Sequence, residues 1–191
     1  MDTLLCIRHA QSTMNAVGLW QGQANPPLSE EGREQAQALG DRLAGESLSV
    51  LVASDLQRAR ETAEIAARRL GIATRLEPGL RELDVGEWSG LARDEIARRW
   101  PEDFARFRAG DLDLRAGGGE TRRELRTRVV AVLRSLRHSY RVAQVAVVTH
   151  LGVLRTLAPG IQIMNAECFR LDMATLEGSS SFPPGDGGAA Q

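Results

Sequence analysis

Short apolar runs alternate with helix-period apolar stripes along this chain. The first run, over 3–7, predicts a short buried strand, and a loop rich in Gly, Asn and Pro follows it. Ser29 can cap a helix after this loop, and the apolar stripe of that helix runs to about Ala44. The start of the chain therefore predicts a strand, a loop and a helix.

The same pattern then repeats. Residues 50–53 form a second apolar run, which predicts another buried strand. The run ends at Ser54, which can cap a helix over 55–70. Strands that alternate with helices in this way are typical of a parallel sheet.

The middle of the chain is less regular. Between 75 and 119 the sequence contains a short strand candidate and two short helical stretches that are separated by Pro101. We interpret the part over about 88–119 as an insertion or lid. A long amphipathic helix is expected after it, over 120–138.

The last third begins with the most apolar β-branched segment of the chain, 145–149, which predicts a central parallel strand. A short helix is expected over 151–157, and alternation over 168–176 predicts a last strand that could lie at an edge. The tail over 178–191, rich in Gly, Ser and Pro, is expected to be disordered. The whole pattern predicts one α/β domain over 1–177, a three-layer α/β/α sandwich with a mostly parallel central sheet and a lid insertion.

Composition narrows the function classes. The 191 residues are 42% hydrophobic, which is enough to bury the core of one domain. A formal net charge of −1 gives no reason to expect a nucleic-acid or anionic-membrane partner. All 24 basic residues are arginine, so the chain has no lysine for a Schiff base, a P-loop or a kinase site.

Cysteine usage and the N-terminus bear on the compartment. Cys6 and Cys168 lie in apolar segments, far apart and without a metal-ligand pattern, so we expect buried free thiols and a reducing setting. The N-terminus lacks the features of a signal peptide, and no apolar run approaches the ~20 residues of a membrane span. These features predict a cytoplasmic protein.

Candidate chemistry stands at the carboxyl ends of the predicted strands. Arg8 and His9 end the first strand, Arg58 lies one turn into the helix after the second, and His150 ends the most apolar strand. Because the carboxyl ends of parallel strands meet at one edge, we expect all four residues there. A single histidine at a strand end is more often a structural hydrogen-bonding group, but two histidines beside arginines fit phosphoryl transfer.

Six segments of the chain resemble the histidine phosphatase superfamily, the phosphoglycerate mutase-like proteins. They occur in the family's order and spacing, over about residues 3–176, which makes chance a poor explanation. The segments are Arg8-His9-Ala10 through Asn15, Gln21-Gly22 with 27–32, 54–63, Leu80-Arg81-Glu82 with Gly86, Gly118-Gly119-Glu120, and 148–152.

The resemblance implies a catalytic set. His9 would attack phosphorus and form a phosphohistidine that water later hydrolyses. Arg8, Arg58 and His150 would hold the non-bridging oxygens, and Glu82 would protonate the leaving alkoxide.

The resemblance also implies phosphate contacts by Asn15, Gln21, Gly22 and Leu151. Leu151 stands where the family usually has a small residue whose backbone N–H helps to bind phosphate. We expect its larger side chain to narrow the pocket. Asp84 is the competing candidate for the acid.

The predicted function is metal-independent hydrolysis of a small phosphorylated metabolite through a phosphohistidine. A cofactor-dependent phosphoglycerate mutase is one alternative, but family mutases tend to be longer and to use lysine. A non-catalytic phosphate-binding module is the other. We expect no metal and no cofactor, because three His and no clustered carboxylates suggest no site. The expected partner is a small-molecule phosphomonoester, and pairing of the 168–176 strand leaves a homodimer open.

Overall fold

The computed structural model describes residues 3–140 and 144–178, and a five-stranded sheet lies at its centre. The sheet has the order β3-β2-β4-β1-β5, in which β5 is antiparallel to β1 and the other neighbours are parallel. This confirms the mostly parallel sheet, the central position of β4 and the edge position of the last strand. The strands are β1 (Thr3–Arg8), β2 (Val50–Ala53), β3 (Ala73–Leu76), β4 (Val145–Thr149) and β5 (Cys168–Asp172).

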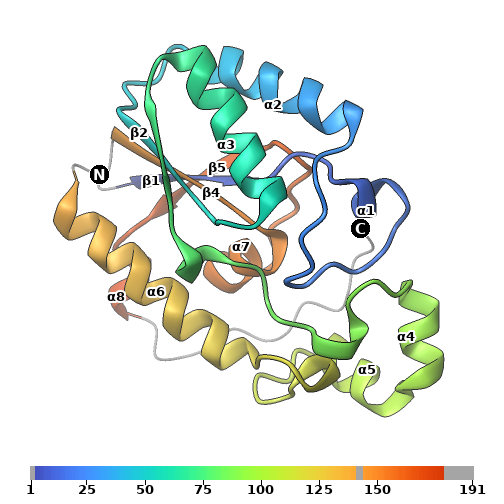
Figure 1. Ribbon diagram of the computed structural model, residues 1–191. Helices are drawn as coiled ribbons and strands as arrows, with labels where there is room; N and C mark the ends of the chain where they lie inside the picture. The colour runs from blue at the N-terminus through green and yellow to red at the C-terminus, as the bar shows by residue number, and fades with distance from the viewer. Residues whose placement is uncertain (1–2, 141–143, 179–191) are drawn as a thin grey trace.

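Helices cover both faces of the sheet, which gives the predicted three layers (Figure 1). On one face lie α2 (Glu30–Leu43) and α3 (Gln57–Leu70), and on the other lie α6 (Arg122–Ser139) and α7 (Leu151–Leu157). The remaining helical elements are α1 (Thr13–Ala16), α4 (Arg93–Arg99), α5 (Pro101–Arg108), α8 (Thr175–Gly178), and the 3₁₀ turns η1 (Pro78–Leu80), η2 (Gly86–Trp88) and η3 (Ala116–Gly118).

The strands supply two separate cores because successive side chains point to opposite faces of the sheet. Leu5 and Ile7 of β1 pack with α2 and α3, whereas Leu4 and Cys6 pack with α6 and α7. The first core is rich in alanine, which lets α3 approach the sheet closely. The sheet is therefore held rigidly from both sides, and its carboxyl edge is a firm base for a site.

The helix starts agree with the sequence at α2 but not at α3. Ser29 caps α2 by accepting from the Gly32 N–H, as its position predicts. The prediction that Ser54 caps a helix from residue 55 is wrong, because α3 begins at Gln57 and its cap residue, Leu56, has no side-chain cap. The long helix α6 begins after Thr121 rather than at residue 120, and Thr121 forms a capping box with Glu124.

Three expectations about the C-terminal part need correction or fall outside the description. The last strand ends at Asp172 instead of continuing to 176, because Asp172 accepts from the Ala174 N–H in a turn that leads to α8. Cys168 is exposed on the edge strand rather than buried, whereas Cys6 is buried as expected. The disordered tail was expected over residues that lie almost wholly outside the described part of the chain.

The predicted lid contains two short helices, α4 and α5, which meet at Pro101 as expected. Its aromatic side chains form a core: Trp88 is fully buried and contacts Trp20, Phe104 and Phe107 at ring-centroid distances of 5.6–6.1 Å. Trp20 belongs to the loop after α1, so the aromatic core ties this loop to the lid.

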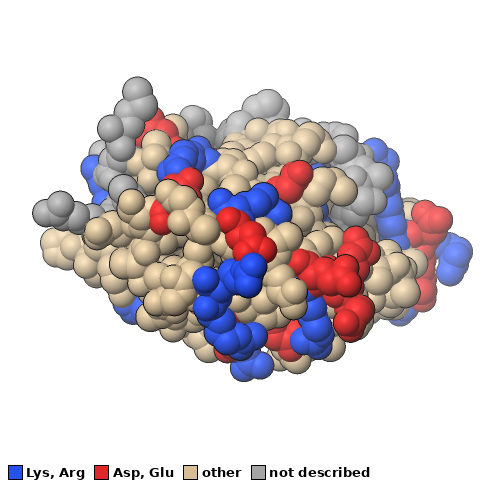
Figure 2. Space-filling view, turned by 90° about the horizontal axis from the view of Figure 1, so that it is seen from above, with Lys and Arg blue, Asp and Glu red and all other residues tan. Residues whose placement is uncertain are grey.

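Charge on the surface is mixed in sign. On the face shown in Figure 2, basic and acidic side chains are interspersed, in keeping with the near-zero net charge. Within the described ranges, no helix combines the length and the apolar character that crossing a membrane requires.

Candidate active site

The sheet register brings the two strand-end histidines together. Arg8 pairs with Thr149 across β1 and β4, and the His9 N–H donates to the Thr149 carbonyl at 2.9 Å. His9 directly follows Arg8, and His150 directly follows Thr149. The ring centroids of the two histidines lie 5.1 Å apart. The expected meeting of these residues at one sheet edge therefore follows from the parallel pairing of β1 and β4.

His9 is oriented through both ring nitrogens. Nδ1 lies 2.7 Å from the Ala10 carbonyl oxygen, which can only accept, so Nδ1 carries the proton. The lone pair then resides on Nε2, which accepts from Nε of Arg58 at 3.3 Å. Burial, followed by the charges of Arg58 and Arg8, holds the pKa of His9 well below 6.5. The ring is therefore neutral at neutral pH and presents a nucleophilic nitrogen.

Two buried arginines supply positive charge. Arg58, the second residue of α3, is 1% exposed, and its terminal nitrogens donate to the carbonyls of Ala24 and Gly22 at 2.8 and 2.9 Å. Arg8 donates through NH1 to the Ile163 carbonyl at 2.9 Å. Its Nε is buried and has no hydrogen-bond partner among the described residues. Burial lowers the pKa of Arg58 to about 10, so it stays charged at neutral pH.

His150 is completely buried and is held by one hydrogen bond, between Nε2 and Oγ of Ser54 at 2.8 Å. Its Nδ1 is buried and unpartnered within the described part of the chain. Burial, then the charges of Arg58 and His9, keeps the pKa of His150 well below 6.5. Buried polar atoms are normally satisfied, so Nδ1 of His150 and Nε of Arg8 mark a place for an acceptor-rich group.

Ser54 contacts the candidate site, although its sequence pattern indicates only a helix cap. Its hydroxyl is fully buried and lies between His150 and the Leu56 N–H, which donates to it at 3.3 Å. Its position could have indicated this contact, because Ser54 directly follows β2. β2 pairs in parallel with β4, so Ser54 and His150 lie at the same carboxyl edge of the sheet.

Glu82 supplies the negative charge of the site. Its Oε1 accepts from the Leu83 N–H at 2.8 Å, and Oε2 accepts from the Gly152 N–H at 3.0 Å. Burial lowers the pKa of Arg8 and of Arg58, and the negative charge of Glu82 partly offsets this effect. Asp84, the competing candidate, instead accepts from the Gly86 N–H in a local turn at 2.9 Å. Of the two candidates, Glu82 is thus the one whose charge acts on both arginines.

The amides of Asn15 and Gln21 meet at Ser12. Oδ1 of Asn15 accepts from the Ser12 N–H at 3.1 Å, and Oε1 of Gln21 accepts from the Ser12 hydroxyl at 2.8 Å. Because these contacts use the carbonyl oxygens, the amide nitrogens are the ends that can donate to a ligand.

The backbone conformation of Gly22 and the burial of Leu151 bear on the phosphate contacts that were expected of them. Gly22 has a φ of +49°, and a Cβ there would lie 2.6 Å from Cγ2 of Val85, so only glycine fits. The side chain of Leu151 is buried in the hydrophobic core around α6 and α7. The structure therefore does not support the expected narrowing of the pocket by Leu151.

The site as a whole is arranged for an anion. Arg8 and Arg58 contribute two buried guanidinium groups, and Nε of Arg8 and Nδ1 of His150 are unpartnered within the described residues. A phosphate group would offer the acceptors and the charge that these residues lack. In the part of the chain that the structure describes, no group of three or more His, Cys, Asp and Glu side chains could hold a metal ion.

Comparisons with known proteins agree with this chemistry. The family model of the histidine phosphatase superfamily (branch 1) matches residues 4–179. A metal-independent phosphoserine phosphatase of Arabidopsis thaliana is 38% identical, over 81% of this chain and 66% of its own. A 2,3-bisphosphoglycerate-dependent phosphoglycerate mutase of Brucella ovis is 32% identical, over 86% and 84%. A mycobacterial glucosyl-3-phosphoglycerate phosphatase, solved in complex with VO3, superposes with a TM-score of 0.82 at 29% identity, over 90% and 91%.

Proposed function

The chain belongs to the histidine phosphatase superfamily (branch 1), and we propose that it hydrolyses phosphomonoesters through a phosphohistidine formed at Nε2 of His9. The observation that carries this proposal is the state of His9. Its Nδ1 proton is held by a backbone carbonyl, and its Nε2 lone pair faces a buried guanidinium. A binding module would need neither feature, because binding alone requires no nucleophile.

The first step transfers the phosphoryl group to the protein. The substrate binds as a monoanion and passes its proton to the Glu82 carboxylate. The phosphate displaces the Arg58 contact from His9, and Nε2 attacks phosphorus in line with the ester oxygen. As the bond from phosphorus to that oxygen breaks, Glu82 gives it a proton, and the free alcohol leaves. Arg8, Arg58 and His150 donate to the non-bridging oxygens, where negative charge is concentrated.

The second step returns the protein to its starting state. A water molecule attacks phosphorus and passes a proton to the Glu82 carboxylate. The bond from phosphorus to Nε2 of His9 breaks, which leaves the imidazole neutral. Inorganic phosphate takes the proton back from Glu82 as it leaves, so Glu82 is again a carboxylate. Atoms and charges balance over the two steps, and no metal ion takes part in either.

The substrate is proposed to be a small phosphorylated metabolite. The names of the two phosphatase relatives refer to small phosphate monoesters, and this chain would act on the same class of compound. A cytoplasmic location and a homodimer through β5 stay predictions from the sequence.

The decisive experiment compares three proteins in EDTA: wild type, His9→Ala and His138→Ala. His138 is the matched control, because it is the third histidine of the chain and lies exposed on α6. Each protein is incubated with p-nitrophenyl phosphate and with 3-phosphoglycerate plus 2,3-bisphosphoglycerate. We expect wild type and His138→Ala to release phosphate, and His9→Ala to lose at least about 10³-fold in rate. Isomerised phosphoglycerate would instead identify a mutase, and an inert wild type would identify a binding module.

A further inference from the structure

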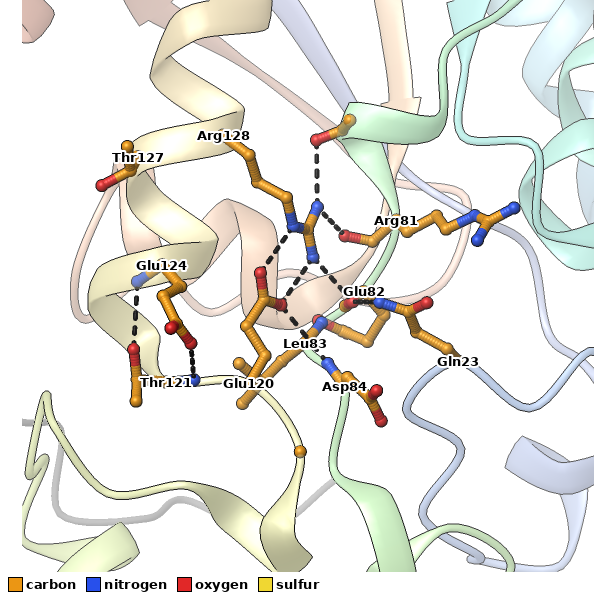
Figure 3. Close-up of polar contacts among 12 residues, drawn as sticks. Gln23, Arg81, Glu82, Leu83, Asp84, Glu120, Thr121, Glu124, Thr127 and Arg128 are labelled. Carbon is orange, nitrogen blue, oxygen red and sulfur yellow. Dashed lines mark hydrogen bonds and ion pairs between the residues drawn. The ribbon is translucent and has the colours of Figure 1, made fainter.

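Arg128 lies in the middle of α6, and its guanidinium group forms hydrogen bonds with the loop that carries Glu82 and with one carboxylate (Figure 3). Nε and NH2 bind the two carboxylate oxygens of Glu120 at 2.7 and 2.8 Å. NH1 donates to the carbonyls of Gly79 and Arg81 at 3.0 and 2.7 Å, and NH2 donates to the Glu82 carbonyl at 2.9 Å. These bonds match the five N–H groups that a guanidinium has.

Glu120 is itself held against the same loop, on the other side of Glu82. Its backbone N–H donates to the Asp84 carbonyl at 2.8 Å, and its Oε2 accepts from the Asp84 N–H at 3.4 Å. The turn before it packs with no space to spare, since a Cβ on Gly119 would lie 2.3 Å from the Asp84 carbonyl oxygen. The side chains of Arg128 and Glu120 are 24% and 15% exposed.

The loop itself has no regular secondary structure between η1 and η2, so sheet and helix bonds do not hold it in place. Its carbonyls receive donors from Arg128 instead, and Gln23 adds a longer bond to the Glu82 carbonyl at 3.3 Å. The planar guanidinium fixes three carbonyls relative to one another, which the single ammonium of lysine could not do. Stability alone would not require a partly buried ion pair here, because its desolvation cost offsets much of its attraction.

We propose that Arg128, anchored by Glu120, is a positioning residue that holds the backbone of Glu82 so that its carboxylate meets the leaving oxygen of the substrate. This inference rests on the proposed function, in which Glu82 supplies that proton. Arg128 binds backbone carbonyls and the Glu120 carboxylate, whereas the Glu82 carboxylate accepts from the Gly152 N–H. The charge of Arg128 also helps to lower the pKa of His150, but its hydrogen bonds go to the Glu82 segment and to Glu120.

The test uses the leaving group of the substrate as its readout. p-Nitrophenolate leaves without a proton, whereas the alkoxide of glycerol phosphate needs one, so loss of the acid affects the second substrate selectively. kcat/KM is the quantity to compare, because it covers only the steps up to transfer of phosphate to His9. Glu82→Gln calibrates the effect: we expect kcat/KM to fall about 100-fold or more for glycerol phosphate and less than about 5-fold for p-nitrophenyl phosphate.

Arg128→Lys should reproduce this selective loss on a smaller scale. We expect a fall of about 10- to 100-fold for glycerol phosphate, with p-nitrophenyl phosphate and the inhibition constant of inorganic phosphate changed less than about 3-fold. Glu120→Gln removes one of the carboxylate oxygens that anchor Arg128, so it should also lower kcat/KM selectively for glycerol phosphate. This variant tests the proposal if Arg128→Lys does not fold. Arg134→Lys is the control, because Arg134 also lies on α6 but donates to the carbonyl of Leu176, in α8.

Two results would overturn the inference. One is an equal loss for both substrates together with a weaker inhibition by phosphate, which would show a merely structural role. The other is no loss in the folded variants. If instead Glu82→Gln shows no dependence on the leaving group, the role of Glu82 in the proposed function fails, independently of Arg128.

Discussion

Gly152 leaves the space in which the Glu82 carboxylate lies. A Cβ at this position would lie 2.2 Å from Oε1 and 3.1 Å from Cδ of Glu82. The Gly152 N–H also donates to Oε2 at 3.0 Å. Gly152→Ala would therefore force the carboxylate to move by about 1 Å to reach ordinary contact, and a misplacement of that size can cost on the order of 10²-fold in rate.

Stability should change much less than activity. The clashing atoms are the far end of a flexible side chain, which can rotate toward water. Gly152 is the second residue of α7, so replacing it by alanine gains at most the roughly 1 kcal/mol of a helix interior. The displaced carboxylate loses hydrogen bonds worth about 1.5–3 kcal/mol each and regains part of that in water. We expect a net change within about 2 kcal/mol, or a melting temperature within about 8 °C of wild type.

The assay measures kcat/KM for glycerol phosphate and p-nitrophenyl phosphate, with circular dichroism to follow unfolding. Gly45→Ala is the matched control, because a Cβ there meets nothing within 4 Å. We expect Gly152→Ala to lose about 100-fold on glycerol phosphate and little on p-nitrophenyl phosphate. Wild-type activity on glycerol phosphate would refute the reasoning, and so would an equal loss on both substrates in a protein that remains folded.

Three further predictions follow from burial and charge. Burial holds the pKa values of His9 and His150 well below 6.5, so in acid the unfolded chain binds more protons than the folded protein. The free energy of unfolding should therefore fall as the pH drops from about 7, by up to about 2.7 kcal/mol per pH unit for the two histidines together. His150→Asn should lose about half of that slope, and an unchanged slope would contradict the assignment. The exposed thiol of Cys168 should react quickly with a disulfide reagent. Burial raises the pKa of Cys6 to about 12, so the Cys6 thiol should react only when the protein unfolds. A fast-reacting thiol in Cys168→Ser would argue against this. Dialysis against EDTA should leave phosphatase activity unchanged, and a loss that a divalent ion restores would count against charge neutralisation by arginine.

Much of the fold and part of the site were accessible from local pattern. The apolar runs of β1 and β4 indicate strands that are buried on both faces, and such strands are parallel with their carboxyl ends at one edge. Arg8, His9 and His150 stand at those ends in the sequence, so their meeting could be predicted without coordinates.

Contacts across the fold decided the rest. The hydroxyl of Ser54 could cap the next helix or bind an imidazole 96 residues away, and only the neighbouring positions of β2 and β4 select the second. The exposure of Cys168 likewise depends on β5 being an edge strand, which an apolar neighbourhood in sequence does not reveal.

The sequence by itself indicated the candidates Arg8, His9 and His150, because strand ends and their polar residues are local features. It placed Glu82 in an irregular segment, but it did not show which residues hold that segment in place. Arg128 looks like an ordinary charged residue of a helix, and the family segment that contains Glu120 does not show what its side chain binds. Only the tertiary structure turns them toward the carbonyls around Glu82, because backbone groups outside sheets and helices must find their partners across the fold.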